Sequence, residues 1–172
     1  NDEQALLDLF SNIDIKLKQE HDTQIVLLNQ EDVTSDIRQP EVTNYVSIVA
    51  KHPKVRQIMV EKQRALATGH GVVMDGRDIG TYVLPHADLK FFLIASVEER
   101  AKRRYKENQA RGIVSDFEEL KKDIEQRDYR DMNRKIAPLK KADDAIEIDT
   151  TSLTIDQVVQ RILDKAKQML DT

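Results

Sequence analysis

The chain has 172 residues, of which 40% are hydrophobic and 34% charged, and its net charge at pH 7 is −4. No apolar run reaches the roughly 18 residues of a membrane-spanning helix, and the lack of cysteine excludes disulfide scaffolds and thiolate zinc sites. The acidic balance does not favour nucleic-acid binding. These properties predict one domain, with no membrane and no nucleic-acid partner, in the cytoplasm.

Changes of hydrophobic period predict the elements of the first part of the chain. In order, these are a helix at 2–11, strands at 13–17 and 23–29, a short extended piece near 32–34, and helices from 41 to about 68. Asp2 is the expected N-cap of the first helix. The two strands suggest an antiparallel hairpin, and Pro53 is placed to begin a new helix within the helical stretch.

The rest of the chain alternates apolar strands with helices. Strands are expected at 71–75, 90–95 and 145–149, and helices at 97–111, 116–134 and 155–170. Ser115 and Glu118 fit a capping box for the second of these helices. The last helix should turn one apolar face inward, formed by Ile155, Val158, Val159, Ile162 and Met169. The pattern predicts an α/β fold in which a parallel sheet is covered by helices, with a small antiparallel insertion.

Four of the five glycines fall between positions 69 and 80, around the segment DGRDIGT. This segment follows an expected strand, and ligands of open α/β sheets bind outside the carboxyl ends of strands. A functional interpretation places Asp75 near a hydrated Mg²⁺, Arg77 on a phosphate and Asp78 as a hydrogen-bond acceptor for a base. Alternatively, Arg77 and Asp78 simply pair with each other in a solvent-exposed turn.

A second candidate site is a set of arginines in the helix expected at 116–134. Arg127, Arg130 and Arg134 have helical spacing and should share one face, where their repulsion favours a bound anion. Guanidinium groups suit phosphate, and Asp131 could orient Arg127 or accept a hydrogen bond from a ligand hydroxyl. The alternative is a solvated, charged helix face.

A third group of arginines, Arg100, Arg103 and Arg104, begins the preceding helix. They flank a junction near Gly112 and could close over phosphates as a lid, or equally pair with nearby glutamates on the surface. The four histidines lack the spacing of metal ligands, so no protein metal site is expected.

Several segments resemble bacterial cytidylate kinases, in matching order along nearly the whole chain. They are VSIVA (46–50), PKVR (53–56), QR (63–64), DGRDIGT (75–81), EERAKRR (98–104), RDYRDMNR (127–134) and APL (137–139). The resemblance implies a nucleoside monophosphate kinase that uses ATP and Mg²⁺ to phosphorylate CMP or dCMP. It also implies a monophosphate-binding insertion at 1–40 and a kinase core at 41–172, with a lid around 100–134.

The family's functional residues can be carried over by position. Cytosine would be recognised by Ser47, Arg56 and Asp78, and the ribose would be held by Arg127 and Asp131. The CMP phosphate would be bound by Arg77 and Arg134. Arg100 and Arg104 would face ATP from the lid. Arg77, Arg134 and Asp75 would act in catalysis. An acidic acceptor favours the amine of cytosine over the carbonyl of uracil, since the latter would leave the carboxylate unpaired.

One family feature does not occur in these 172 residues, namely a phosphate loop of the type G-x-x-x-x-G-K-[ST]. We therefore expect a kinase chain without its amino-terminal part, with doubtful activity on its own and an apolar gap between the strands at Val72 and Phe91. Two alternatives remain: a kinase for UMP or dTMP, and a non-catalytic anion-binding module. A monomer is expected, with small-molecule nucleotides as its only partners.

Overall fold

The computed structural model describes residues 3–21, 23–69 and 71–170, and it divides into two compact units. The first unit is Asn1–Val72 and the second is Val73–Thr172. The family-based division at residue 40 lies inside the first unit and stays a prediction. Asp2, the expected N-cap of the first helix, falls outside the described residues.

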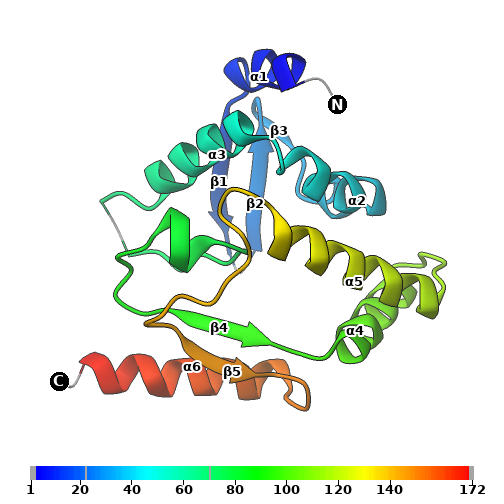
Figure 1. Cartoon of the computed structure of the whole chain (residues 1–172), viewed down its shortest axis with the longest axis vertical. Helices are drawn as coiled ribbons and strands as arrows, with labels where there is room; N and C mark the ends of the chain where they lie inside the picture. The colour runs from blue at the N-terminus through cyan, green and yellow to red at the C-terminus, as the bar shows by residue number, and fades with distance from the viewer. Residues whose placement is uncertain (1–2, 22, 70, 171–172) are drawn as a thin grey trace. The chain divides into compact units, whose positions relative to one another are not determined.

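The first unit combines a three-stranded antiparallel sheet with helices (Figure 1). Its elements are α1 (Glu3–Ser11), β1 (Ile15–Glu20), β2 (Thr23–Leu28), β3 (Glu31–Asp32), the 3₁₀ turn η1 (Asp36–Arg38), α2 (Pro40–Val49) and α3 (Pro53–Leu66). Strand β2 lies between β1 and β3, and the β1–β2 hairpin pairs Ile15 with Leu28 and Glu20 with Thr23. The predicted antiparallel hairpin is thus confirmed.

Proline sets the start of both longer helices of this unit. Pro40 and Pro53 occupy the first turns of α2 and α3, where the missing N–H would have no helical partner. Helix α3 packs against α1 and carries the buried Val55 and Val60. Arg56 lies between these valines in the sequence and is itself only 8% exposed.

The second unit is built around a parallel pair of strands. Its elements are the π-helical turn η2 (Ile79–Val83), β4 (Phe91–Ile94), α4 (Val97–Ala110), α5 (Phe117–Asn133), β5 (Ile146–Asp149) and α6 (Ile155–Leu170). Strands β4 and β5 run parallel, with Phe91 beside Ile146 and Ile94 beside Asp149. The predicted α/β class, these two strands and the three long helices are confirmed.

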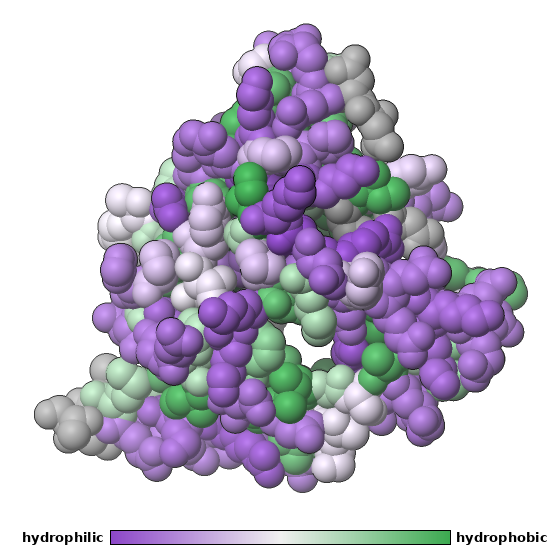
Figure 2. Space-filling model, in the orientation of Figure 1, coloured by the Kyte–Doolittle hydropathy of each residue, from purple (hydrophilic) through white to green (hydrophobic). Residues whose placement is uncertain are grey.

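Helices α4 and α5 lie side by side as a helical hairpin (Figure 1). The rings of Tyr105 and Phe117 meet edge to face at 6.2 Å near the turn between them. The surface over these helices is mainly hydrophilic in the view of Figure 2, as their charged sequences require. No helix among the described residues is both long and apolar enough to cross a bilayer.

Residues 71–75 do not form the strand predicted from their apolar sequence. The segment has no regular secondary structure, and its Val73 is fully exposed. A strand is stabilised by backbone hydrogen bonds to a neighbour, and the described residues offer none to this segment. The parallel sheet therefore has two strands here instead of three.

The predicted cap of α5 is wrong by one residue. Asp116, not Ser115, is the N-cap, and its carboxylate accepts a hydrogen bond from the backbone N–H of Glu119. The Ser115 hydroxyl is buried and has no hydrogen-bond partner within the described part of the chain. Both residue types favour the N-cap position, so sequence alone did not distinguish them.

The inner face predicted for α6 is also only partly correct. Val158 and Ile162 are half-buried, whereas Ile155 (82%), Val159 (47%) and Met169 (50%) are exposed. Helical period fixes which side chains share a stripe, but the neighbouring elements decide how much of that stripe is covered.

Candidate functional site

Asp131, near the end of α5, is the centre of an arginine cluster. Its side chain is only 7% exposed, and it pairs with Arg77 at 3.1 Å, Arg134 at 3.7 Å and Arg127 at 3.9 Å. The helix brings Arg127 to Asp131 because residues four apart share a face. Arg77 comes from the DGRDIGT segment, 54 positions away in the sequence.

Arg134 connects this cluster to Asp78. One of its terminal nitrogens lies 3.2 Å from an Asp78 carboxylate oxygen, and both side chains are nearly buried. Arg134 sits just beyond the last turn of α5 in an extended conformation, and its Nε donates to the carbonyl of Ala137. The backbone N–H of Leu139 returns to the carbonyl of Asp131, which closes the turn.

That turn contains a residue with unusual backbone geometry. Ala137 is 8% exposed and has φ +48°, in the left-handed region that costs a residue with a Cβ about 1–2 kcal/mol. The carbonyl it presents to Arg134 helps fix where that guanidinium points. Backbone strain of this kind occurs often at ligand-binding sites.

The cluster carries more positive than negative charge. Three guanidinium groups face two carboxylates, those of Asp78 and Asp131. Burial lowers the pKa of the Arg127 guanidinium, and the nearby Arg77 and Arg104 lower it further. The Arg127 Nε is buried and has no hydrogen-bond partner among the residues described. A partly desolvated cation whose one carboxylate contact is long, at 3.9 Å from Asp131, favours a bound anion.

The predicted pattern of arginines on α5 needs two corrections. Arg130 is exposed and its Nε donates to the carbonyl of Gln126, so it is not part of the cluster. Arg134 lies past the helix end, so the three side chains do not share one helical face. The chain instead reaches Asp131 from the turn that follows α5, which the helical spacing did not indicate.

The arginines of α4 are mostly engaged by carboxylates. Arg100 makes a bidentate pair with Asp128 of α5, at 2.6 and 3.0 Å, and its Nε donates to the carbonyl of Ala95. Arg104 lies 3.7 Å from Glu107 in an exposed pair. The same helix contains the pairs Lys102–Glu98 and Arg103–Glu99, and its C-cap residue Arg111 pairs with Glu107. Surface pairing with nearby glutamates was one of the two interpretations, and it describes Arg103 and Arg104 but not Arg100.

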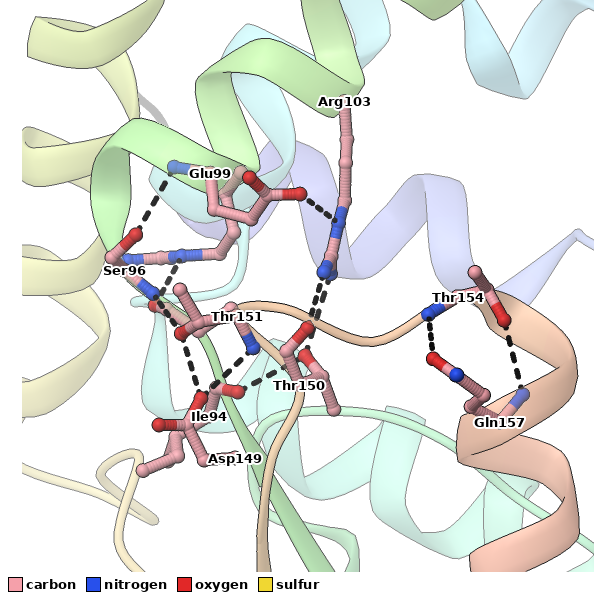
Figure 3. A network of polar contacts seen from close by, with 11 residues as sticks. Ile94, Ser96, Glu99, Arg103, Asp149, Thr150, Thr151, Thr154 and Gln157 are labelled. Carbon is pink, nitrogen blue, oxygen red and sulfur yellow. Dashed lines mark hydrogen bonds and ion pairs between the residues drawn. The ribbon is translucent and has the colours of Figure 1, made fainter.

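A polar network at the carboxyl ends of β4 and β5 was not predicted (Figure 3). Arg103 donates to both the carbonyl and the hydroxyl of Thr150, which is 5% exposed, and the Thr150 hydroxyl donates to the carbonyl of Ile94. Ser96 caps α4 by accepting from the N–H of Glu99, a spacing typical of a capping box. The Ser-x-x-Glu pattern was the available sequence signal.

The Thr151 side of this network involves Asp149. The backbone N–H and the hydroxyl of Thr151 both donate to the Asp149 carboxylate, and these hydrogen bonds lower its pKa. The Thr151 hydroxyl also accepts from the N–H of Ser96. The network therefore fixes the N-terminus of α4 at the edge of the sheet where ligands of α/β proteins bind.

The remaining predicted site residues are less informative. Arg56 is buried in the first unit, where a terminal nitrogen donates to the carbonyl of Ala50 at 3.3 Å. The side chain of Ser47 lies outside the described residues. Asp75 is exposed, in the segment without regular structure before Arg77. The described residues contain no cluster of three or more acidic, histidine or cysteine side chains that could hold a metal by itself.

Comparisons with known proteins agree with the motifs of the sequence. The family described as cytidylate kinase matches residues 1–168. A cytidylate kinase of Geobacillus sp. (strain WCH70) is 64% identical over 164 residues, which are 95% of this chain and 73% of the relative. A cytidylate kinase of Geobacillus kaustophilus (strain HTA426) is 61% identical over 95% of this chain and 73% of the relative. One of Bacillus cereus (strain AH187) is 56% identical over 94% of this chain and 72% of the relative. The chain belongs to the cytidylate kinase family.

Proposed function

We propose that this protein transfers the γ-phosphoryl group of ATP to CMP or dCMP. The observation that carries the proposal is the arginine cluster, in which Arg77, Arg127 and Arg134 surround Asp131 with positive charge in excess. Phosphoryl transfer needs little covalent chemistry from the protein, so its main requirements are positioning and charge stabilisation. The name of the family and of the relatives, cytidylate kinase, supports CMP or dCMP as the substrate.

The roles in the acceptor site follow from charge and hydrogen-bonding capacity. Arg77 and Arg134 bind the CMP phosphate and stabilise charge on the transferred group, since each guanidinium offers several donors to phosphate oxygens. Arg127 and Asp131 hold the ribose, where the carboxylate accepts from a hydroxyl. On binding, phosphate oxygens replace part of the carboxylate contacts that these arginines make in the free protein.

Asp78 accepts a hydrogen bond from the exocyclic amine of cytosine. Uracil presents a carbonyl at the same position and would leave a nearly buried carboxylate facing an oxygen. Unpaired buried polar groups allow discrimination of about 10⁴-fold. The family resemblance gives Ser47 and Arg56 a role in cytosine recognition as well, and the burial of Arg56 suits a preorganised side chain.

ATP is bound from the lid side by Arg100 and Arg104. Arg104 is the more available of the two, because the pair it forms with Glu107 is long and exposed. Mg²⁺ usually keeps several waters and takes one or two carboxylates plus the substrate phosphates, and a single exposed acid such as Asp75 fits that requirement. When bound, the ion neutralises charge on the phosphates.

We also propose that the protein works as a monomer in the cytoplasm.

A panel of nucleotides tests the assignment. Calorimetry on the natural full-length protein should give binding of CMP and dCMP with at least tenfold preference over UMP and dTMP. Asp78→Asn should reduce this preference, since an amide can donate to a carbonyl. Asp123→Asn, a change of the same kind at an exposed position of α5, should not. Preference for UMP or dTMP would assign a different pyrimidine kinase, and equal binding of all four with no turnover would indicate an anion-binding module.

Comparing CMP with cytidine isolates the phosphate contacts. Arg134→Ala should weaken CMP binding about a hundredfold, because a charge-assisted hydrogen bond is worth roughly 1.5–3 kcal/mol. Cytidine lacks the phosphate, so its affinity should change much less. Equal losses for both ligands would contradict the phosphate role of Arg134.

A further inference from the structure

A buried lysine that none of these roles uses lies directly before β4. The side chain of Lys90 is 7% exposed, and its ammonium group donates to the carbonyl of Pro85 at 2.5 Å and to the Asp144 carboxylate at 2.7 Å. Lysine is almost never fully buried unless its charge is paired. Its hydrogen bonds therefore hold two loops against the start of β4.

The aliphatic part of Lys90 contacts the turn that follows the DGRD segment. A Cβ added to Gly80 would lie 3.3 Å from the Lys90 Cδ, so the glycine backbone rests against the lysine stem. Gly80 belongs to η2, in which the N–H of Val83 bonds to the carbonyl of Asp78 and that of Leu84 to the carbonyl of Ile79. Such five-residue π-turns are rare and are found frequently at functional sites.

Lys90 thus restrains η2 at two points, by its stem at Gly80 and by its ammonium group at Pro85 just beyond the turn. Asp78 is the residue immediately before η2, and its carbonyl also accepts from the N–H of Tyr82. Any shift of η2 is therefore passed to the Asp78 backbone. The ion pair with the exposed Asp144 supplies the counter-charge that lets the lysine stay buried.

We infer that Lys90 is a positioning residue for CMP recognition, which it serves by fixing η2 and thereby the direction of the Asp78 carboxylate. The inference rests on the proposed function, since it assumes that Asp78 reads the base. Lys90 touches no substrate in this assignment. Its loss is expected to affect CMP and to spare ATP, whereas a residue that only stabilises the fold would affect both.

Steady-state kinetics on the natural full-length protein tests the inference. Lys90→Met keeps the stem and removes the ammonium group, and should raise KM for CMP about tenfold while KM for ATP stays within about twofold. Lys90→Arg restores a charged donor and should recover most of the loss. The matched control is Lys141→Met, which removes a lysine from an exposed pair with Glu147 and should change neither constant.

Two outcomes would overturn the inference: an unchanged KM for CMP in Lys90→Met, or equal increases for CMP and ATP. If Lys90→Met does not fold, Gly80→Ala and Asp144→Ala decide instead. Gly80→Ala presses a methyl group against the Lys90 stem, and Asp144→Ala removes the exposed counter-ion of the lysine. An unchanged KM for CMP in both variants would also overturn the inference. A wild-type protein inactive towards CMP would refute the proposed function itself, whereas an active one with an unaffected Lys90→Met would refute only the role of Lys90.

Discussion

Replacing Asp131 by Asn removes the negative charge that three arginines share. The side chain is nearly isosteric, so the change tests charge with little change in packing. Arg77, Arg127 and Arg134 would then face one carboxylate, that of Asp78, in place of two. The variant should be less stable than the wild type in the absence of ligand, and more responsive to added anions.

The size of the loss depends on how buried each pair is. Removing one partner of a buried ion pair typically costs about 3–5 kcal/mol, but Arg134 keeps Asp78 at 3.2 Å, which lowers that figure. Arg77 is 42% exposed, so its pair with Asp131 is screened by solvent and adds at most about 1 kcal/mol. We therefore expect Asp131→Asn to lower the free energy of unfolding by about 2–3 kcal/mol.

Urea unfolding with and without inorganic phosphate measures both effects. Asp123→Asn is the control, since Asp123 is an exposed aspartate of the same helix, and it should change stability by less than about 0.5 kcal/mol. Phosphate should raise the unfolding free energy of Asp131→Asn more than that of the wild type, because an anion that binds only the folded state stabilises it by mass action.

Two results would refute this reasoning. A loss no larger than that of the Asp123 control would mean that Asp131 does not balance the arginines in solution. Equal stabilisation of both proteins by phosphate would mean that the anion binds elsewhere, since the excess charge in the cluster would then not govern its affinity.

Three further predictions concern the lid and the sheet edge. Asp128→Asn, which removes the bidentate partner of the α4 arginine, should speed amide hydrogen exchange in α4 and α5, and unchanged exchange would show that this pair does not hold the helices together. Asp116→Ala should lower the free energy of unfolding in urea by about 1 kcal/mol, which is more than Ser115→Ala should. A larger loss in Ser115→Ala would mean that Ser115 is the N-cap of α5. Thr151→Val should raise the pKa of Asp149 towards its ordinary value in an NMR titration. Because folding lowers the pKa of Asp149, the stabilisation is complete above the ordinary pKa and is lost as the pH falls through the lowered one. An Asp149 pKa that is the same in the variant as in the wild type would refute the role of Thr151.

The local elements and the chemical types of the site followed from the sequence. Alternating residues indicated β1 and β5, a short apolar run indicated β4, and Pro53 marked the start of α3. These features depend on neighbours within a few positions, where backbone sterics and side-chain period act directly. The arginines and aspartates of the cluster were also identifiable as residue types, and helical spacing indicated the contact between Arg127 and Asp131. The contacts that Arg77 and Arg134 make with Asp131 were not indicated.

Contacts between distant segments were decided only by the tertiary structure. The apolar sequence of 71–75 is typical of a strand, yet it stays unpaired because pairing needs a second backbone alongside it. Arg134 reaches Asp131 and Asp78 from a turn beyond α5, and Lys90 is buried because Pro85 and Asp144 meet its charge. A sequence shows what each side chain can bind. Burial and the partners that compensate it are properties of the folded chain, and these determine whether a charge is costly, paired or ready for a ligand.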